Sequence, residues 1–382
     1  MIRRAVFISQ LTDGEAGRTA ADLSLHLSEK NECFVVVENS QKADYPYGGN
    51  LVSLDSKNFL TKTYQLKQFK DDFAVVTVVS FGTWPNLLNI YTRKKERVII
   101  SVRESLSLAG GGLIKEAEQY LMKKYYPKAD RIVVPLAEIK KELLTELKID
   151  ESKISVIYNP INVAKIKSLV QEKQEFEFRD IYAHPVVVNT GKLTKGKGHR
   201  QLIKAFKKMK DEVPGAKLHL LGDGDMKGIL LQLVDDLDLE NDVFFGGGDE
   251  NPYRYLARAA VAVFPSEYEE YPYDLCEAMA CGVPVLASDC KKGPREILTA
   301  DTEIRPATRE LEEARYGALL PVCREGISNY IEDYTPEELI LAQGLVKAVK
   351  EQEFYRKRAA RALERVEDFN RERIMALWDK LI

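Results

Sequence analysis

Lysines and glycines follow a predicted strand in the second half of the chain. The strand Val186–Thr190 leads into a loop that carries Lys192, Lys197 and three glycines before a helix begins. Glycines let the backbone approach an anion closely, and the two ammonium groups would neutralise the charge of a diphosphate. The loop lacks the G-x-x-x-x-G-K-[ST] spacing of a P-loop, and a solvated turn is the alternative interpretation. His199 is expected to cap the helix or pack at its start rather than to react.

Two glutamates, Glu269 and Glu277, follow the predicted strand Val261–Pro265. The helix that begins near Asp274 offers free backbone N–H groups and the positive end of its dipole to a phosphate. Glu277, one turn into that helix, is placed to accept two ribose hydroxyls, as acidic residues do in dinucleotide sites. Glu269 lies in the loop, within reach of a sugar beyond the phosphates. The alternative is a surface acidic loop followed by a capping acid.

Two further patterns resemble ligand sites less closely. Asp223-Gly224-Asp225 imitates a D-x-D metal motif, but it ends the predicted strand Lys217–Leu221, so a turn is the preferred interpretation. Gly246-Gly247-Gly248 is too short for a dinucleotide fingerprint, which needs G-x-G-x-x-G between a strand and a helix. We therefore predict neither a metal nor a cofactor, since lysines would take the place of a metal at the diphosphate.

Short apolar strands alternate with helical segments along the chain, which is the pattern of βαβ units whose strands are buried on both faces. The first set of predicted strands is Ala5–Ser9, Cys33–Glu38, Phe73–Ser80, Val98–Val102, Arg131–Pro135 and Ile154–Tyr158. The second set is Val186–Thr190, Lys217–Leu221, Val243–Phe245, Val261–Pro265 and Pro284–Ala287. The charged stretch Ser168–Asp180 separates the two sets, and the sequence is helical from Pro336 onward.

The length of 382 residues exceeds the usual size of one domain. We predict an α/β protein of two doubly wound Rossmann-like domains, residues 1–170 and residues 171–382, the second ending in helices. Such domains bind ligands outside the carboxyl ends of their strands, so their sites are expected to face each other across a cleft. Both loops described above fall at such strand ends.

The charge of the chain is unevenly distributed. Residues 1–170 carry 25 basic and 20 acidic residues, a net charge of +5, whereas residues 171–382 carry 31 and 39, a net charge of −8. The basic half indicates either an anionic partner, such as a membrane surface or a lipid phosphate, or ordinary solvated charge. The start of the chain has the pattern of a strand rather than a signal peptide, and no apolar run approaches the roughly 18 residues of a membrane span. We expect a cytoplasmic protein without a nucleic-acid partner.

Glu269 and Glu277 form an E-x7-E motif. Together with the upstream loop Gly191–Gly198, they resemble the retaining glycosyltransferases of the large group 1 family, which have the GT-B fold. The similarity is dense over residues 185–298. Further segments are similar to that family's junction between domains and to its subgroup that adds galactose or N-acetylhexosamine to bacterial surface glycans: Ile154–Pro160, Asn251-Pro252-Tyr253 and Ser288–Leu298.

The resemblance implies roles for the residues that match in the second domain. Lys197, and Lys192 where the family usually has arginine, would bind the donor diphosphate. Glu277 would hold the ribose, and Glu269 would contact the donor sugar as a catalytic group. Further donor contacts are implied for the backbone beside the sugar and for two glycines near the base: Tyr271, Pro272, Tyr273, Gly246 and Gly247.

The resemblance also implies roles in the first domain. Asp13–Gly17 is similar to the family's glycine-rich loop that closes on the donor, which makes Gly17 a donor-binding residue. Arg103, counted as catalytic, and Glu104 fall where the family places polar groups of the active site. The first domain would take the acceptor, and the second would take the nucleotide-sugar donor.

The implied reaction transfers a hexose or N-acetylhexosamine, with retention, from a UDP-sugar to a glycan or polyprenyl-diphosphate-linked acceptor in surface polysaccharide biosynthesis. The E-x7-E motif argues against an epimerase or a phosphorylase. Three departures leave a catalytically inactive binding or scaffold protein open as the alternative. Lys192 lacks the bidentate fork of arginine, Glu270 stands where glycine is usual, and the loop of the first domain lacks an adjacent pair of glycines.

The segment Gly112–Lys128 combines lysines with tyrosines and leucines. Most of its apolar residues are expected to pack on the first sheet. Lysines and tyrosines together at a helix end also suit contact with anionic lipid, so we predict reversible docking at the inner face of the cell membrane. The residues concerned are Lys115, Lys123, Lys124 and Lys128, with Leu113, Ile114, Tyr120, Leu121, Tyr125 and Tyr126.

Overall fold

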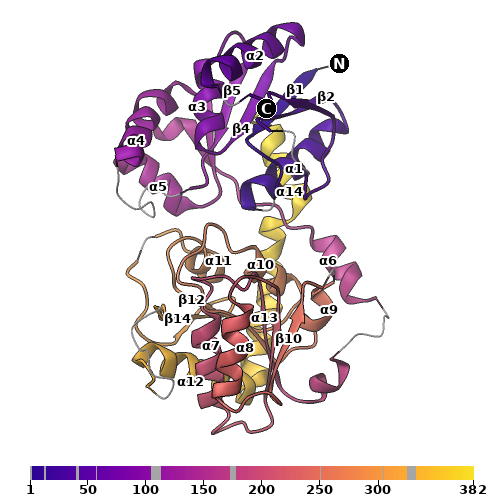
Figure 1. Cartoon of the computed structure of the whole chain (residues 1–382), viewed down its shortest axis with the longest axis vertical. Helices are drawn as coiled ribbons and strands as arrows, with labels where there is room; N and C mark the ends of the chain where they lie inside the picture. The colour runs from indigo at the N-terminus through magenta and orange to yellow at the C-terminus, as the bar shows by residue number, and fades with distance from the viewer. Residues whose placement is uncertain are drawn as a thin grey trace. The chain divides into compact units, whose positions relative to one another are not determined.

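The computed structural model describes residues 2–12, 14–39, 43–56, 58–104, 113–172, 178–249, 251–303, 305–324 and 333–382, with side chains for all of these except 113–115. The chain divides into two compact units (Figure 1). Unit 1 comprises Met1–Pro160 and Arg371–Ile382, and unit 2 comprises Ile161–Asn370. Within the described residues, each unit contains a seven-stranded sheet flanked by helices.

The described strands of unit 1 are parallel and lie in the order β3-β2-β1-β4-β5-β6-β7. Most are runs of valine and isoleucine buried on both faces, as a parallel sheet covered by helices requires. The strands are β1 Arg3–Ile8, β2 Glu32–Val37, β3 Asn50–Ser53, β4 Thr77–Phe81, β5 Arg97–Ser101, β6 Arg131–Val134 and β7 Ile154–Val156. The helices are α1 Glu15–Ser28, α2 Phe59–Asp72, α3 Thr83–Tyr91, α4 Leu113–Tyr125, α5 Ala137–Glu146 and α14 Arg371–Asp379, with short 3-10 turns at Tyr126–Lys128 and Glu151–Lys153.

Unit 2 has the strand order β10-β9-β8-β11-β12-β14-β13, in which β13 alone among the described strands is antiparallel to its neighbour. The strands are β8 Val186–Thr190, β9 Lys217–Leu221, β10 Val243–Gly247, β11 Val261–Phe264, β12 Val285–Ser288, β13 Glu312–Glu313 and β14 Ala318–Leu320. The helices are α6 Val163–Val170, α7 His199–Met209, α8 Lys227–Asp236, α9 Tyr253–Leu256, α10 Tyr273–Ala280, α11 Pro294–Thr299, α12 Pro336–Lys350 and α13 Gln352–Val366, with 3-10 turns at Arg179–Ala183 and Glu367–Phe369.

Both sheets have the doubly wound order that the sequence predicts. In unit 1, β1 lies between β2 and β4, and in unit 2, β8 lies between β9 and β11. The direction of strand order therefore reverses beside β1 and beside β8. Ligands of such sheets bind outside the carboxyl ends of the strands at this reversal point. The loops that follow β8 and β11 are the two that carry the lysines and the glutamates.

Two strands of unit 1 differ from the prediction. The sequence does not predict the edge strand β3, because its four residues are half-buried or exposed and form no apolar run. The predicted strand Phe73–Ser80 begins too early. Ala74 has a left-handed φ of +43°, which breaks the extended backbone, and β4 starts only at Thr77.

The boundary between the units also differs from the predicted one at 170/171. The helix α6 belongs to unit 2, where it packs against α9 and α10, and the amide of Asn251 donates to the carbonyl of Leu169 over 2.9 Å. The last helix, α14, returns to unit 1, where Trp378 is fully buried in the core. The centre of the predicted linker, residues 173–177, lies outside the described residues.

Candidate active site

The loops after β8 and β11 lie against each other at the reversal point of unit 2. Gly198 has a φ of +73°, and a Cβ at this position would lie 2.1 Å from the carbonyl oxygen of Pro265. Only glycine therefore lets the first loop approach the end of β11 this closely. The backbone N–H of Glu267 donates to the carbonyl of Gly196 over 2.8 Å. The structure thus brings together the two motifs that the sequence singles out.

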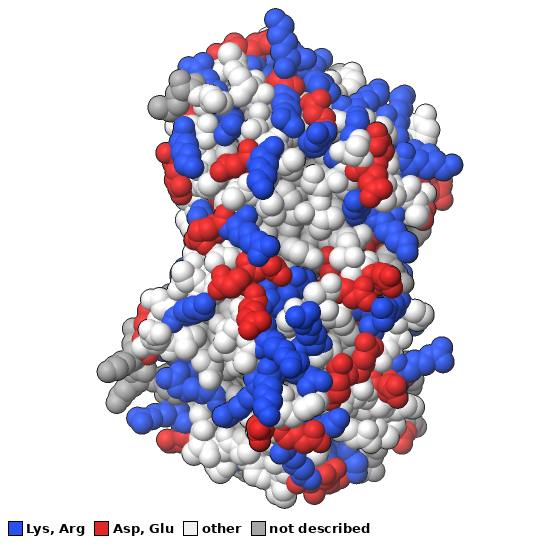
Figure 2. Space-filling view, turned by 180° about the vertical axis from the view of Figure 1, so that it is seen from behind, with Lys and Arg blue, Asp and Glu red and all other residues white. Residues whose placement is uncertain are grey.

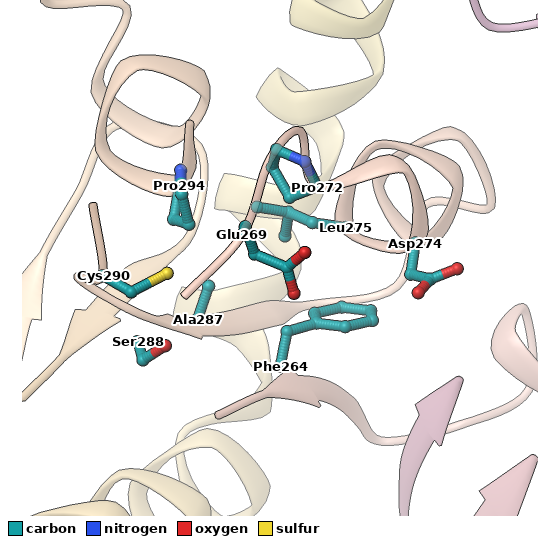
Figure 3. Close-up of a pocket in the computed structure, with 9 residues that line it drawn as sticks. All are labelled: Phe264, Glu269, Pro272, Asp274, Leu275, Ala287, Ser288, Cys290 and Pro294. Carbon is teal, nitrogen blue, oxygen red and sulfur yellow. The ribbon is translucent and has the colours of Figure 1, made fainter. Parts of the chain in front are cut away.

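Lys197 and Glu269 form an ion pair between these loops. The ammonium of Lys197 donates to both carboxylate oxygens of Glu269, over 2.8 and 2.9 Å. Figure 3 shows the Glu269 carboxylate turned toward Phe264 and Asp274, beside the start of α10. Burial lowers the pKa of Lys197, but the charge and hydrogen bond of Glu269 outweigh burial and raise it above the ordinary value. Lys197 is therefore a firmly charged group at neutral pH.

Helix α10 begins directly after this pair. Pro272 precedes its first turn, Tyr271 is buried, and the rings of Tyr271 and Tyr273 lie 5.2 Å apart. Glu277 lies one turn into the helix and is 8% exposed. The helix therefore starts beside the ion pair, with a largely buried carboxylate in its second turn.

A small cavity adjoins Glu269 at the start of α10 (Figure 3). Its volume of about 10 Å³ is room for about one water molecule, so a sugar would not fit inside it. Its lining residues are Phe264, Glu269, Pro272, Asp274, Leu275, Ala287, Ser288, Cys290 and Pro294. Ser288, the last residue of β12, and Cys290 extend the site to a third strand end.

His199 packs at the start of α7, as the sequence predicts. Its Nε2 is hydrogen-bonded to Oδ1 of Asn189 over 2.9 Å, and the Asn189 amide donates to the carbonyl of Val263 over 2.7 Å. Burial, assisted by the charge of Lys197, lowers the pKa of His199 to about 4. The neutral imidazole therefore helps to hold the ends of β8 and β11 together.

Three predicted charged groups that follow β8 and β9 lie at the surface: Lys192, Asp223 and Asp225. Lys192 is exposed at the beginning of its loop. Asp223 forms a turn, as predicted, in which its carboxylate accepts the N–H of Gly224 over 2.9 Å, and Asp225 is exposed beside it. Within the described ranges, no group of three or more His, Cys, Asp or Glu residues is arranged to hold a metal ion.

Two of the predicted ligand-binding glycines have packing roles. A Cβ on Gly246 would lie 2.6 Å from Nε2 of the buried His219, and a Cβ on Gly17 would lie 2.4 Å from the carbonyl oxygen of Thr12. Gly247, with a φ of +64°, has open space around its Cβ position. Donor contacts at these three glycines stay a prediction. The packing of the fold already requires glycine at Gly17 and at Gly246.

Arg103 lies in a buried network of unit 1. Its guanidinium donates to Glu15 over 3.3 Å and to the amide oxygen of Asn159, and it lies over the ring of Phe81 at 5.2 Å. The Asn159 amide also donates to Glu15 over 2.7 Å. The sequence assigned no partner to Arg103, although Glu15 and Asn159 both follow strand ends. Glu104, by contrast, is exposed and accepts from Thr83 over 3.3 Å.

Comparisons with known proteins match both halves of the chain to glycosyltransferase families. A model of the family described as glycosyl transferases group 1 matches residues 171–305, and a model of glycosyltransferase family 4 matches residues 16–165. An uncharacterized glycosyltransferase of Methanocaldococcus jannaschii is 35% identical over 264 residues. The matched residues are 68% of this chain and 65% of that relative, so this chain spans just under two thirds of the relative's length. The chain thus carries a glycosyl transferases group 1 domain over residues 171–305 and a glycosyltransferase family 4 domain over residues 16–165.

Other glycosyltransferases extend the similarity over more of the chain. A Campylobacter jejuni transferase, N-acetylgalactosamine-N,N'-diacetylbacillosaminyl-diphospho-undecaprenol 4-alpha-N-acetylgalactosaminyltransferase, is 28% identical over 79% of this chain and 84% of its own. Anabaena HepE in complex with UDP superposes with a TM-score of 0.77 at 15% identity, covering 100% of this chain and 99% of HepE. A glycosyltransferase of Rickettsia africae gives a TM-score of 0.76 at 15% identity, covering 100% and 97%. At these identities the solved structures show the shared fold, GT-B.

The ion pair of unit 2 already joins a cation to an anionic oxygen donor set at the surface of the candidate site. Lys197 is partly exposed and already holds one carboxylate in a bidentate contact. A diphosphate offers the same kind of oxygen acceptors with more charge, so it is a chemically matched replacement for Glu269. The exchange would leave the carboxylate of Glu269 free beside the bound donor.

Proposed function

We propose that this glycosyl transferase moves a hexose or an N-acetylhexosamine from a UDP-sugar, with retention, to a glycan or polyprenyl-diphosphate-linked acceptor in surface polysaccharide biosynthesis. The observation that carries the proposal is the ion pair of Lys197 and Glu269 beside the N-terminus of α10. Two similar proteins support the proposed substrates. The name of the Campylobacter transferase contains a diphospho-undecaprenol-linked sugar, and HepE was solved in complex with UDP.

The proposed reaction breaks the bond between the anomeric carbon and the donor phosphate. Negative charge develops on the leaving UDP, where Lys197, Lys192 and the N–H groups of α10 stabilise it. Glu269, released from Lys197 by the diphosphate, faces the positive charge that develops on the sugar. The acceptor hydroxyl forms the new bond on the same face and passes its proton to the leaving phosphate. Glu277 holds the ribose throughout.

The experiment that tests this function measures UDP release from a panel of UDP-sugars in excess EDTA. We expect release with at least one donor, because lysines rather than a metal neutralise the diphosphate. Glu269→Ala should lower the rate strongly. Activity that needs added manganese or magnesium would contradict the metal-free site. Donor binding without release or transfer, for every sugar tried, would favour the inactive binding protein.

We also propose that the protein works on the cytoplasmic face of the membrane, where a polyprenyl-linked acceptor is presented. None of the described helices is long and apolar enough to cross a bilayer. Figure 2 shows basic and acidic side chains interspersed over the face drawn there, so docking needs a local basic surface. Lys123, Lys124 and Lys128 are exposed on and after α4, whereas the side chain of Lys115 lies outside the described residues. Flotation with anionic against neutral vesicles tests this docking, and equal flotation of Lys123/Lys124/Lys128→Gln would contradict it.

A further inference from the structure

Unit 1 contains an apolar pocket that the proposed reaction does not use. It lies between α2, α3 and α4 and has a volume of about 350 Å³, within the range of roughly 300–1,000 Å³ that is typical of sites for small molecules. Its lining side chains are Phe59, Trp84, Leu87, Tyr91, Leu121 and Tyr125. They come from all three helices, so the pocket is a product of the fold rather than of one loop.

Large aromatic side chains are exposed around this pocket. Phe59, Trp84 and Tyr91 are 48%, 46% and 51% exposed, and the ring of Phe59 lies 6.2 Å from that of Tyr91. Leu60 and Tyr64, on the same helix as Phe59, are 74% and 67% exposed. Contiguous exposed apolar surface of this kind marks a site of contact with another molecule.

Lysines surround the polar edge of the pocket. Lys67 lies 5.4 Å from the ring centre of Tyr91, while Lys128 and Lys124 lie 4.7 and 5.7 Å from that of Tyr125. The two tyrosine rings are 6.4 Å apart, so all three ammonium groups gather around one pair of rings. In the part of the chain that the structure describes, none of the three lysines has an ion pair with a carboxylate. An anionic group would be attracted to this edge.

The lining indicates what kind of ligand fits. Its polar groups are one indole and two phenols, and it contains no carboxylate, amide or guanidinium. A sugar placed here would leave most of its hydroxyls without partners, at a cost in free energy. A hydrocarbon chain needs no such partners and gains from leaving water. Tryptophan and tyrosine with nearby lysines are also the residues enriched where proteins meet the membrane interface.

We propose that this pocket takes one hydrocarbon chain of an anionic membrane lipid, with the lipid phosphate held against Lys67, Lys124 and Lys128. The inference rests on the docking at the membrane surface proposed above. It adds where on unit 1 the lipid binds and that the lipid is anionic. Charge complementarity at the edge and an apolar interior together select an amphiphile with a negative head group. Binding by charge alone would not need the pocket.

The chain's own tryptophans allow a direct test, because it has only Trp84, in the pocket, and Trp378, fully buried in the core. The parent protein and Trp378→Phe are mixed with vesicles of phosphatidylglycerol that carry bromine on the acyl chains, and with matching phosphatidylcholine vesicles. We expect bromine to quench Trp84 in the phosphatidylglycerol vesicles only. If Trp378→Phe folds poorly, the parent protein still serves for the test, because its buried Trp378 adds only a constant fluorescence background.

Two pairs of variants separate the chain from the head group. Leu121→Gln places an amide in the pocket and should abolish the quenching of Trp84 while vesicle flotation persists. The control Ile229→Gln changes an exposed apolar residue of α8 in unit 2, and its Trp84 should be quenched as in the parent. Lys67/Lys124/Lys128→Gln should weaken binding to the vesicles roughly tenfold to a hundredfold. The control Lys30/Lys141/Lys148→Gln removes the same charge from exposed positions elsewhere on unit 1 and should have little effect.

The outcomes distinguish this inference from the transferase itself. Quenching that depends on the anionic lipid and on Leu121 supports it. Flotation without quenching, quenching that survives in Leu121→Gln, or equal quenching by neutral vesicles would overturn the pocket as a lipid site. Absence of any vesicle binding would overturn both the pocket and the membrane docking. UDP release measured on the same preparation without vesicles reports separately on the proposed transferase.

Discussion

Charged pairs lie at strand ends in both units, but the two units expose them differently. In unit 1, the side chains of Arg103 and Glu15 are 4% and 6% exposed. In unit 2, those of Lys197 and Glu269 are 31% and 14% exposed. Breaking a fully buried pair leaves a charge without solvent, whereas a partly exposed pair exchanges partners at low cost. We therefore expect the buried pair to hold unit 1 together and propose that the partly exposed pair of unit 2 exchanges a partner for the donor.

The largest effect is expected from removing the buried charge of unit 1. Arg103→Met should lower the free energy of unfolding of unit 1 by about 3–5 kcal/mol, because Glu15 loses its buried partner. Both tryptophans lie in unit 1, so fluorescence during denaturation reports on that unit. Lys197→Met, followed by far-UV circular dichroism, should cost no more than about 1 kcal/mol. Similar losses of unfolding free energy in the two variants would contradict the difference between the buried pair of unit 1 and the partly exposed pair of unit 2.

Mild acid should destabilise unit 2 through two buried histidines. Burial lowers the pKa of His219 to about 4, and burial with the charge of Lys197 does the same for His199. Their unfolded pKa is about 6.5, so below that pH the unfolded chain binds protons that the folded chain does not. Stability is therefore complete above pH 6.5 and falls as the pH is lowered, by about 2 kcal/mol per histidine at pH 5.

Denaturation followed by far-UV circular dichroism at pH 7 and pH 5 measures this loss. His199→Gln should remove about half of it, and His219→Gln about half. A parent protein equally stable at both values of pH would show that the histidines are not held neutral in unit 2.

The assignment of the ribose site predicts a loss of UDP affinity. Glu277→Ala should weaken UDP binding by about 1–3 kcal/mol, the cost of losing charge-assisted hydrogen bonds. Calorimetric titration measures the change, and Glu240→Ala, an exposed glutamate between α8 and β10, is the matched control. The role of Glu277 would have to be abandoned if both variants bound UDP like the parent.

Substitution of Glu269 is expected to change UDP affinity less than that of Glu277, and in the opposite direction. Glu269→Gln removes the competing charge from Lys197 and should tighten UDP binding by up to about 1 kcal/mol, the strength of a partly exposed ion pair. Transfer should nevertheless slow, because the carboxylate that faces the sugar is gone. Weaker UDP binding in Glu269→Gln would show that the diphosphate does not replace this side chain.

The sequence predicts the strand-end positions of the site because buried valine and isoleucine runs define the parallel strands. With those strands placed, the loops that carry Lys197 and Glu269 necessarily lie at the carboxyl edge, and the structure brings them together. Five of the six predicted strands of unit 1 need little change of bounds, whereas β3 has too little apolar surface to leave a pattern.

Other parts of the site depend on contacts between distant residues. Arg103 and Glu15 are separated by 88 residues, so local spacing does not reveal that they pair. A glycine in the sequence does not show what its missing side chain makes room for, and at Gly246 it is His219. The helix α14 follows other helices in the sequence rather than a strand of unit 1. Only the packing of Trp378 in the core shows that this helix belongs to unit 1.

The most direct test of the account is calorimetric titration of UDP and of uridine into the parent protein and Lys197→Met. Uridine lacks the diphosphate, so its binding isolates the contribution of Glu277 and the base. Lys197→Met should weaken UDP binding roughly tenfold to a hundredfold, about 1.4–2.7 kcal/mol, and leave uridine binding unchanged. Equal UDP affinity in the two proteins would contradict the claim that Lys197 exchanges Glu269 for the donor diphosphate.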